Sequence, residues 1–466
     1  MKNYNQDRYL ISENRTVEEA LSKIEINTLG FICTTNEKGE VVGLATDGDI
    51  RRGLIRGVAL NAPISQCSNS EFLSADVNTS REQLIKRLDS RIQFIPIIDK
   101  LGKLQSVVSK NHLPLDDEKA VYIRSRAPVR VSFGGGGSDL THYFENKSGA
   151  VINTAVSIYS HGVMRVRDDS KIIINSLDLG ATLTAENLQD AISQDGPFGL
   201  IQSLLHVVQP THGFELCLNS DFPVGSGLGG SATLSAVVLG CFNMLRSDQW
   251  NQHELAEIAF QAERLHLGVA GGWQDQYAAV FGGFNFIEFH PDENIVSPIR
   301  LHSKIALELE ESLLLCDTGI GHHSGNIHND QKESMSSEVV QKLVAENVEL
   351  TYSARKYLLR GDLVKFGECL DTAWRLKRNF SSMISNDHLD AIYNGAIENG
   401  ALGGKLLGAG GGGFFIFYVP PFKKHTLMSY LKSKKLTIQP FRFEPDGLKT
   451  WTSRESEKLL IEEQKN

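Results

Sequence analysis

Apolar and polar positions follow the same pattern twice in the first 115 or so residues. The stretch GFICTTNEKGEVVGLATDGDI (30–50) aligns without gaps on QFIPIIDKLGKLQSVVSKNHL (93–113), an offset of 63, and residues 16–21 match residues 79–84 at the same offset. Each copy predicts a helix, a strand, a tight turn at Gly39 or Gly102, a second strand and a helix. Such a repeat indicates a unit that buries its apolar face against its twin. The polar segment LDDEKAVY (115–122) predicts a linker, which gives a first domain over residues 1–118.

From Arg124 on, strand and helix patterns mix without a regular period. APVRVSF (127–133) alternates like a strand, and SATLSAVVLGCFNML (231–245) predicts a largely buried helix. KLLGAGGGGFFIFYV (405–419) predicts a glycine hinge before a buried strand. In NQHELAEIAFQAERLHLG (251–268) apolar residues recur at helical spacing, which predicts an amphipathic helix with an inner face of Leu255, Ile258, Ala259, Ala262 and Leu265. The mixture favours an α+β fold over a doubly wound sheet.

Composition and charge narrow the class of protein. The 466 residues suffice for about three domains, and a net charge of −9 argues against a general binder of nucleic acids or anionic membranes. The start MKNYNQDRYLISENR lacks the apolar core of a signal peptide, and no run approaches the roughly 20 apolar residues of a membrane span. Six cysteines stand singly, four of them in apolar runs such as FELCL and LLLCD, which predicts buried free thiols. We therefore expect a cytoplasmic protein.

The stretch PVGSGLGGSAT (223–233) contains the G-x-G-x-x-G pattern of a dinucleotide-binding turn. That interpretation fails because Asp248, the acid at the required distance, follows no strand. A Walker A loop is excluded because its Lys is missing. What remains is general: a glycine-rich loop exposes backbone N–H groups and leads into a helix N-terminus, and together they bind an anion. Ser231 begins that helix, so its hydroxyl either caps the helix or is a ligand of Mg²⁺.

The same stretch resembles the second motif of the GHMP kinases (galactokinase, homoserine, mevalonate and phosphomevalonate kinases), Pro-x-x-x-Gly-Leu-Gly-Ser-Ser-Ala. Gly230 stands where that family usually has its first Ser. Two further motifs follow the family order, RAPVRVSFGGGGSDL (126–140) and GGKLLGAGGGGFFIF (403–417), so the resemblance covers about residues 124–450. It implies the GHMP kinase fold with subdomains over residues 123–300 and 301–466. It also implies binding of ATP and Mg²⁺ by the loop residues Pro223, Gly225, Ser226, Gly227, Leu228, Gly229, Gly230, Ser231 and Ala232.

The resemblance assigns roles in phosphoryl transfer, which needs positioning, charge neutralisation and a base. Asp275 matches the catalytic base, Arg130 the cation near the base and the transferred phosphoryl group, and Thr318 a threonine that hydrogen-bonds the catalytic Asp. Glu263 would share Mg²⁺ with Ser231. Substrate contacts are implied for Ser138, Asp139, Gly411 and Gly412. His322, His323 and His328 lack further residues at ligand spacing, so contact with an anionic substrate is the alternative to a metal site.

Within the GHMP kinases the chain resembles the D-glycero-D-manno-heptose 7-phosphate kinase group, through RAPVRVSFGGGGSDL, GGWQDQYAAVFGGFNFIEF and LLLCDTGIGHHSGNI. A galactokinase would have Gly-Glu-His-Thr-Asp where this chain has GGGGSD. The resemblance implies phosphorylation of an anomeric hydroxyl to give a 1,7-bisphosphate for nucleotide-activated heptose synthesis. Ser138 stands where Thr is usual and Trp273 where Lys is usual, which leaves the sugar open. The alternatives are an anomeric kinase for another sugar, such as fucose, and a catalytically silent nucleotide sensor; a homodimer is also open.

The N-terminal repeat resembles a tandem pair of CBS (cystathionine-β-synthase-type) modules, most clearly in GLATDGDIRRGL (43–54). In such pairs a strand ends in Thr or Ser, and an Asp shortly after it binds the ribose of an adenine nucleotide; Thr46 and Asp49 match. The second copy keeps Ser109 but has His112 at the Asp position. We therefore expect one nucleotide site that modulates the kinase, with a docking module without a ligand as the alternative.

Overall fold

The computed structural model describes residues 6–27, 29–89, 92–109, 119–321, 327, 330–331, 333–334 and 337–456. The chain divides into two compact units, Met1–Lys119 and Ala120–Asn466, which we describe separately. His112, His322, His323 and His328, singled out in the sequence, lie outside the described residues.

The N-terminal unit holds two small sheets that repeat at the predicted offset. One sheet consists of β1 (Leu10–Ser12), β2 (Phe31–Thr35) and β3 (Val41–Thr46), and the other of β4 (Ala75–Asp76), β5 (Phe94–Ile98) and β6 (Leu104–Ser109). The helices are α1 (Val17–Asn27), α2 (Asp47–Ile55) and α3 (Arg81–Arg87). Gly39 and Gly102 turn each hairpin with φ values of 76° and 77°, a left-handed conformation that suits glycine.

The two copies share an apolar interface. Phe31 and Cys33 of β2 pack with Leu104 and Val107 of β6, and the rings of Phe31 and Phe94 stack with centroids 4.7 Å apart. This contact confirms the prediction that the repeat buries one copy against the other, because neither three-stranded sheet could cover its apolar face alone.

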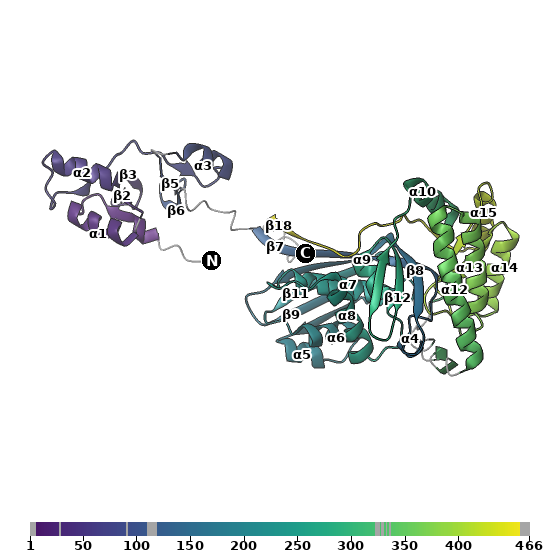
Figure 1. Cartoon of the computed structure of the whole chain (residues 1–466). Helices are drawn as coiled ribbons and strands as arrows, with labels where there is room; N and C mark the ends of the chain where they lie inside the picture. The colour runs from purple at the N-terminus through teal and green to yellow at the C-terminus, as the bar shows by residue number, and fades with distance from the viewer. Residues whose placement is uncertain are drawn as a thin grey trace. The chain divides into compact units, whose positions relative to one another are not determined.

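The first layer of the kinase-like unit is an eight-stranded, mostly antiparallel sheet. Its strand order is β10-β9-β11-β8-β12-β13, and β7 lies between β8 and β18. The strands are β7 (Lys119–Gly134), β8 (Gly149–Val166), β9 (Ile172–Ser176), β10 (Ala181–Ala185), β11 (Phe214–Ser220), β12 (Phe284–Phe289), β13 (Asn294–Pro298) and β18 (Lys449–Ser456). The helices that accompany them are α4 (Thr141–Phe144), α5 (Leu188–Ser193), α6 (Gly199–Val208), α7 (Gly230–Asn243), α8 (Gln252–Phe260) and α9 (Gln274–Phe281) (Figure 1).

The second layer gathers a four-stranded sheet and long helices at one end of this unit (Figure 1). The strands are β14 (Leu313–Asp317), β15 (Gly403–Leu406), β16 (Phe414–Tyr418) and β17 (Ile438–Gln439). The helices are α10 (Ser303–Ser312), α12 (Glu338–Arg360), α13 (Leu363–Lys377), α14 (Asp387–Glu398) and α15 (Lys424–Ser433). Phe133 of β7 meets Phe366 of α13 edge to face at 5.2 Å, so one core joins the layers. The fold is α+β, as predicted, although β18 returns to the first sheet from within the range expected for the second subdomain.

Two expectations on burial are wrong. Leu265 is 73% exposed, because the helix predicted over 251–268 changes at Gln261–His266 into a π-helical turn that rotates later residues off the apolar face. Cys217 is exposed although it stands in an apolar run. In β11 the alternating residues Phe214, Leu216 and Leu218 point into the core, which places Cys217 on the opposite face.

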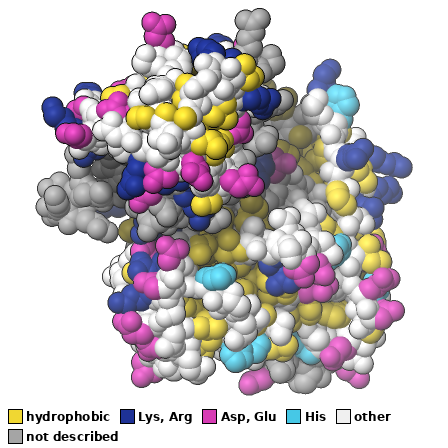
Figure 2. All heavy atoms as spheres, turned by 90° about the vertical axis from the view of Figure 1, so that its left-hand side faces the viewer, with side chains coloured by type: hydrophobic (Ala, Val, Ile, Leu, Met, Phe, Trp, Pro, Cys, Tyr) yellow, Lys and Arg dark blue, Asp and Glu magenta, His cyan; other side chains and the backbone are white. Residues whose placement is uncertain are grey.

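The outer surface carries charges of both signs. Figure 2 shows acidic and basic side chains interspersed over the face that it displays. Among the described residues, no helix combines the length and the apolar character needed to traverse a lipid bilayer.

Candidate active site

The glycine-rich loop connects β11 to α7 and comes close to the acid expected to be catalytic. Gly225, Gly227 and Gly229 have φ values of 78°, 73° and 84°, which only glycine adopts at little cost. Gly229 is the N-cap of α7, and no side chain caps this helix end. A Cβ at Gly229 would lie 3.3 Å from Oδ2 of Asp275. The loop therefore delivers the N-terminus of a 14-residue helix directly beside Asp275.

Ser231 faces a carboxylate and does not cap the helix. Its Oγ donates a hydrogen bond to Oε1 of Glu263 at 2.5 Å, and Glu263, only 3% exposed, lies on the π-helical turn. Gln276 donates to the other oxygen of Glu263 at 2.8 Å, and Nη1 of Arg264 lies 3.2 Å from Oε1. Of the two roles left open for the Ser231 hydroxyl, capping is excluded.

A hydroxyl and one carboxylate fit the protein's share of a Mg²⁺ site. This ion usually keeps several waters and takes one or two carboxylates together with phosphate oxygens of the substrate. No group of three or more His, Cys, Asp or Glu residues in the described parts of the chain could hold a metal ion unaided. Ser231 and Glu263 therefore suit an ion that arrives with phosphates.

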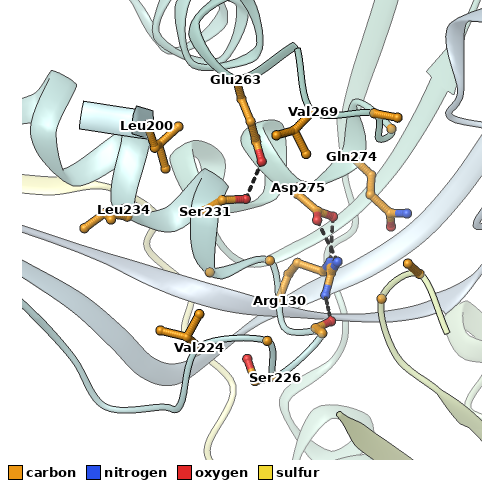
Figure 3. Close-up of a pocket in the computed structure, with 18 of the residues that line it drawn as sticks. Arg130, Leu200, Val224, Ser226, Ser231, Leu234, Glu263, Val269, Gln274 and Asp275 are labelled. Atoms are coloured by element: carbon orange, nitrogen blue, oxygen red, sulfur yellow. Dashed lines mark hydrogen bonds and ion pairs between the residues drawn. The ribbon is translucent and has the colours of Figure 1, made fainter. Parts of the chain in front are cut away.

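Arg130 and Asp275 form a two-pronged ion pair. Nε of Arg130 lies 2.7 Å from Oδ1 of Asp275, and Nη2 lies 2.7 Å from Oδ2. Nη1 donates to the carbonyl oxygen of Gly227, also at 2.7 Å. Figure 3 shows this pair next to the Ser231–Glu263 pair in one pocket. Strand β7, the glycine loop and the first turn of α9 are thus tied together by a single buried guanidinium.

Asp139 lies buried at the same cavity. Its Oδ1 accepts from the backbone N–H of Gly137 at 2.9 Å, and its Oδ2 accepts from Nε2 of Gln274 at 3.1 Å. Burial and, after it, the charge of Asp275 raise the pKa of the Asp139 carboxyl above its ordinary value, while these hydrogen bonds act in the opposite direction. A Cβ on Gly272 would overlap this carboxylate, so a glycine is required there.

The side chains of Ser138 and Trp273 contact other groups of the protein. Oγ of Ser138 donates to the carbonyl oxygen of Gly135 at 2.8 Å and accepts from the N–H of Ala150 at 3.1 Å. Ser138 is fully buried and does not line the cavity, so the expected substrate contact is absent. Trp273 stacks on Phe260 with ring centroids 3.6 Å apart and offers no cation where the family usually has Lys.

Thr318 does not reach the predicted catalytic Asp. Its hydroxyl donates to the carbonyl oxygen of Gly413 at 2.7 Å, while both carboxylate oxygens of Asp275 accept from Arg130. The expectation of a Thr318–Asp275 hydrogen bond is therefore wrong. Thr318 fastens the end of β14 to the glycine hinge instead.

The hinge glycines lie behind the cavity. The N–H of Gly411 donates to the carbonyl oxygen of Ile384 at 2.9 Å, and a Cβ on Gly412 would overlap the backbone of Ile320. Gly408 and Ala409 line the cavity in place of the expected Gly411 and Gly412.

The cavity has a volume of about 760 Å³, and both apolar and polar residues line it. One part is apolar, and Figure 3 shows Leu200, Leu234 and Val224 on one side of Ser231 with Gln274 and Asp275 on the other. Of the loop residues predicted to bind nucleotide, those that line it are Gly225, Ser226, Gly227, Gly229, Gly230 and Ser231. Leu228 and Ala232 are buried in the core, and Pro223 lines a smaller neighbouring cavity of about 210 Å³.

Several polar residues of the cavity were not predicted: Arg264, Gln274, Lys377 and Lys405. Lys405 carried a usable signal, because a Lys between apolar residues and glycines in GGKLLG is unusual for a strand that proves fully buried. Lys377, in AWRLKRNF, carried none.

In the N-terminal unit Thr46 and Asp49 bond to each other. Thr46 caps α2 by accepting from the N–H of Asp49 at 3.2 Å, and Oδ2 of Asp49 accepts from the N–H of Thr46 at 3.0 Å. The other oxygen pairs with Arg52 at 2.5 Å. The two predicted nucleotide-binding residues thus form a capping box at the end of β3.

Comparisons with known proteins match both units. The model of the GHMP kinases N terminal domain matches residues 197–283, that of the GHMP kinases C terminal domain residues 354–427, and that of the CBS domain residues 5–56. The first copy of the repeat is therefore a CBS domain, and the second copy has the same strand topology.

Individual relatives are sugar kinases. A D-glycero-alpha-D-manno-heptose 7-phosphate kinase of Campylobacter jejuni is 36% identical over 335 residues, which cover 71% of this chain and 98% of that protein. An L-fucokinase/L-fucose-1-P guanylyltransferase of Bacteroides fragilis is 28% identical and covers 67% of this chain, which spans only 36% of that longer protein. The crystal structure of a D-glycero-D-manno-heptose 1-phosphate kinase from Bacteroides thetaiotaomicron superposes with a TM-score of 0.60 at 28% identity, over 71% of this chain and 98% of that one. With the three motifs assembled around one cavity, this similarity shows that the chain belongs to the GHMP kinase family, as a sugar kinase with an N-terminal CBS domain.

Proposed function

We propose that this protein uses Mg²⁺ and ATP to phosphorylate the anomeric hydroxyl of D-glycero-D-manno-heptose 7-phosphate, giving the 1,7-bisphosphate that serves nucleotide-activated heptose synthesis. The observation that carries the proposal is the placement of the Arg130–Asp275 pair beside the loop that leads to Ser231 and Glu263. The similarity to the heptose 7-phosphate kinase of C. jejuni supports the choice of sugar.

The chain's own groups suit in-line transfer from ATP. Backbone N–H groups of the glycine loop and the N-terminus of α7 would hold the phosphates, and the apolar part of the cavity would take the adenine. Ser231 and Glu263 would hold Mg²⁺, which neutralises charge on the β- and γ-phosphates when bound. Held in this way, the γ-phosphorus would lie next to the pair of Arg130 and Asp275.

Asp275 then accepts the proton of the anomeric hydroxyl. The hydroxyl oxygen forms the new bond to the γ-phosphorus, the bond from that phosphorus to the bridging oxygen breaks, and ADP leaves with the electron pair. Arg130 uses three of its five N–H groups for Asp275 and Gly227, and the remaining N–H of each Nη can donate to the charge that develops on the phosphoryl oxygens. Asp139, oriented by Gln274, is the remaining acceptor for a sugar hydroxyl.

Two rivals predict different outcomes in one assay. The purified protein would be incubated with Mg-ATP and a panel of sugars and sugar phosphates, and ADP release would be measured. We expect the highest kcat/KM with the heptose 7-phosphate. A higher value with fucose would transfer the assignment to that sugar, as the similarity to a fucokinase allows. No ADP release with any sugar tested would favour a catalytically silent nucleotide sensor. The contacts of Ser231 with Glu263 and of Arg130 with Asp275 argue against that outcome.

We further propose that the CBS pair (residues 1–118), followed by subdomains near 123–300 and 301–466, binds one adenine nucleotide at Thr46 and Asp49. The CBS match over residues 5–56 supports this site. Binding a ribose would require Asp49 to exchange its partner Arg52, whose side chain is 65% exposed. AMP would be titrated into the full chain and into Asp49→Asn, which keeps a side-chain oxygen for the capping box. Equal binding by both, or none by either, would leave the unit as a docking module.

A further inference from the structure

The charged side chains that line the cavity do not all have partners. Arg130 pairs with Asp275, and Arg264 lies against Glu263. Two further cations, Lys377 and Lys405, also line the cavity. No carboxylate oxygen among the described residues lies within 4.0 Å of either ammonium group. After pairing, the cavity keeps these two cations and two carboxylates, Asp139 and Asp178, and neither carboxylate is in direct contact with an ammonium group.

Both lysines are deeply buried and belong to the second layer. Lys377 ends α13, is 5% exposed, and donates a hydrogen bond to the carbonyl oxygen of Gly408. Lys405 lies in β15 and is 3% exposed. Phe380 and Gln331 line the cavity with them. Burying an ammonium group without a counter-ion is costly, so such a pair facing a cavity indicates a site that an anion completes.

The electrostatic surroundings place this pair with the groups that would bind the acceptor. Burial, together with the charge of Arg130, lowers the pKa of Lys377 to about 8, while Asp139 and Asp275 act in the opposite direction. Burial and the charges of Lys377 and Arg130 hold the pKa of Lys405 well below its ordinary value, opposed by Asp139. Glu263 does not contribute to either shift. The charges that act on the two lysines are therefore those of Arg130, Asp139 and, for Lys377, Asp275.

We propose that Lys377 and Lys405 bind the phosphate group that the sugar already carries, and so select a phosphorylated sugar over its unphosphorylated form. This inference rests on the proposed function, because it needs the acceptor hydroxyl to lie at Asp275. The anomeric hydroxyl and the phosphate stand at opposite ends of the sugar, so a molecule held at Asp275 and Asp139 can extend its phosphate to the two lysines. A phosphate dianion matches two ammonium groups in charge and in hydrogen-bonding capacity. No other lysine lines the described cavity to provide this recognition.

The test compares two substrates that differ only in the phosphate. At saturating Mg-ATP, kcat and KM would be measured for the heptose 7-phosphate and for the unphosphorylated heptose with wild type, Lys377→Met, Lys405→Met and the double variant. We expect kcat/KM for the phosphorylated sugar to fall at least ~10-fold in each single variant, mainly through KM, because each loses a charge-assisted hydrogen bond. The value for the unphosphorylated heptose should stay within about 3-fold. Equal losses for both sugars would overturn the proposal and assign the lysines to the transferred phosphoryl group.

Control variants and a binding measurement distinguish failure of the lysine site from failure of the proposed function. Lys365→Met removes an exposed lysine of the same helix, and Lys377→Gln retains a donor for Gly408 if the Met variant folds poorly. Inorganic phosphate would also be titrated calorimetrically in the presence of Mg-ADP. Weaker phosphate binding by the double variant is expected whichever sugar is the substrate. Unchanged phosphate binding would refute the lysine site, whereas failure of the proposed function would appear as wild-type activity on other sugars only.

Discussion

Arg130 donates hydrogen bonds to both carboxylate oxygens of Asp275, although the two residues are 145 positions apart in the chain. The third branch of the guanidinium holds the backbone of Gly227. One planar cation thus fixes the orientation of the acid relative to the loop expected to hold phosphate. A lysine could supply the charge at this position but could not form the same fork.

Asp275→Asn keeps the shape of the side chain and removes the carboxylate. If proton abstraction contributes to the reaction, kcat should fall at least ~10²-fold, while the affinity for ATP should stay close to that of wild type. Single-turnover kinetics would measure the chemical step without product release. Near-full turnover by the variant would show that catalysis depends on positioning alone and that Asp275 is not the base.

Glu263→Gln removes the charge that Ser231 faces, and Gln276 can still hydrogen-bond the new side chain. We expect the Mg²⁺ concentration for half-maximal rate to rise, because a neutral amide is a weaker ligand than a carboxylate for a hard cation. Rates would be recorded against MgCl₂ at fixed ATP. An unchanged midpoint, with only a lower plateau, would contradict a Mg²⁺ role for Glu263.

Gly272→Ala places a methyl group where the Asp139 carboxylate lies. The displaced carboxylate should lose its hold on a sugar hydroxyl, so kcat/KM for the sugar should fall ~10–100-fold, as expected for a lost charged hydrogen bond. Gly321→Ala is the matched control, because a Cβ there meets no atom of the described residues within 4 Å. Normal sugar kinetics in Gly272→Ala would remove Asp139 from substrate binding.

Lys377 predicts a particular dependence of stability on pH. The ordinary pKa of a lysine is 10.5, and burial lowers the pKa of Lys377 in the folded protein to about 8. Between these values the unfolded chain binds a proton that the folded chain lacks, so stability rises with pH in this range, and the penalty is fully present below pH 8. Relative to Lys377→Met, the free energy of unfolding of wild type should rise by up to about 3 kcal/mol between about pH 8 and about pH 10.5. Urea unfolding at several pH values would measure the free energy of unfolding of both proteins. A difference between the two that stays constant up to pH 10 would be incompatible with a charged, buried Lys377.

Much of the architecture could be predicted because its signals are local. The offset of 63 reproduces the strand bounds of β2 and β5 and of β3 and β6. Alternation in 127–133 gives part of β7, and the glycine pattern gives the loop before α7. These features depend on neighbours in the sequence, so short windows carry them.

The features that could not be predicted depend on contacts between segments that are distant in the sequence. Thr318 bonds Gly413 across the β14–β16 pair, and no residue near Thr318 in the sequence indicates this partner. The π-helical turn exposes Leu265 and buries Glu263, an effect that a regular helical period cannot show. Lys377 and Lys405 reach the cavity only because α13 and β15 pack behind it. The residues of the motifs were therefore identified, but several of their partners were not.

Phosphorus NMR of the product decides whether the assembled groups act as proposed. The purified protein would be incubated with Mg-ATP and D-glycero-D-manno-heptose 7-phosphate, and the spectrum recorded as ATP is consumed. We expect a new resonance whose phosphorus couples to the anomeric proton, beside the original phosphate signal, in step with ADP formation. A new phosphate on any other hydroxyl, or ATP consumption without a second sugar phosphate, would contradict transfer to the anomeric hydroxyl.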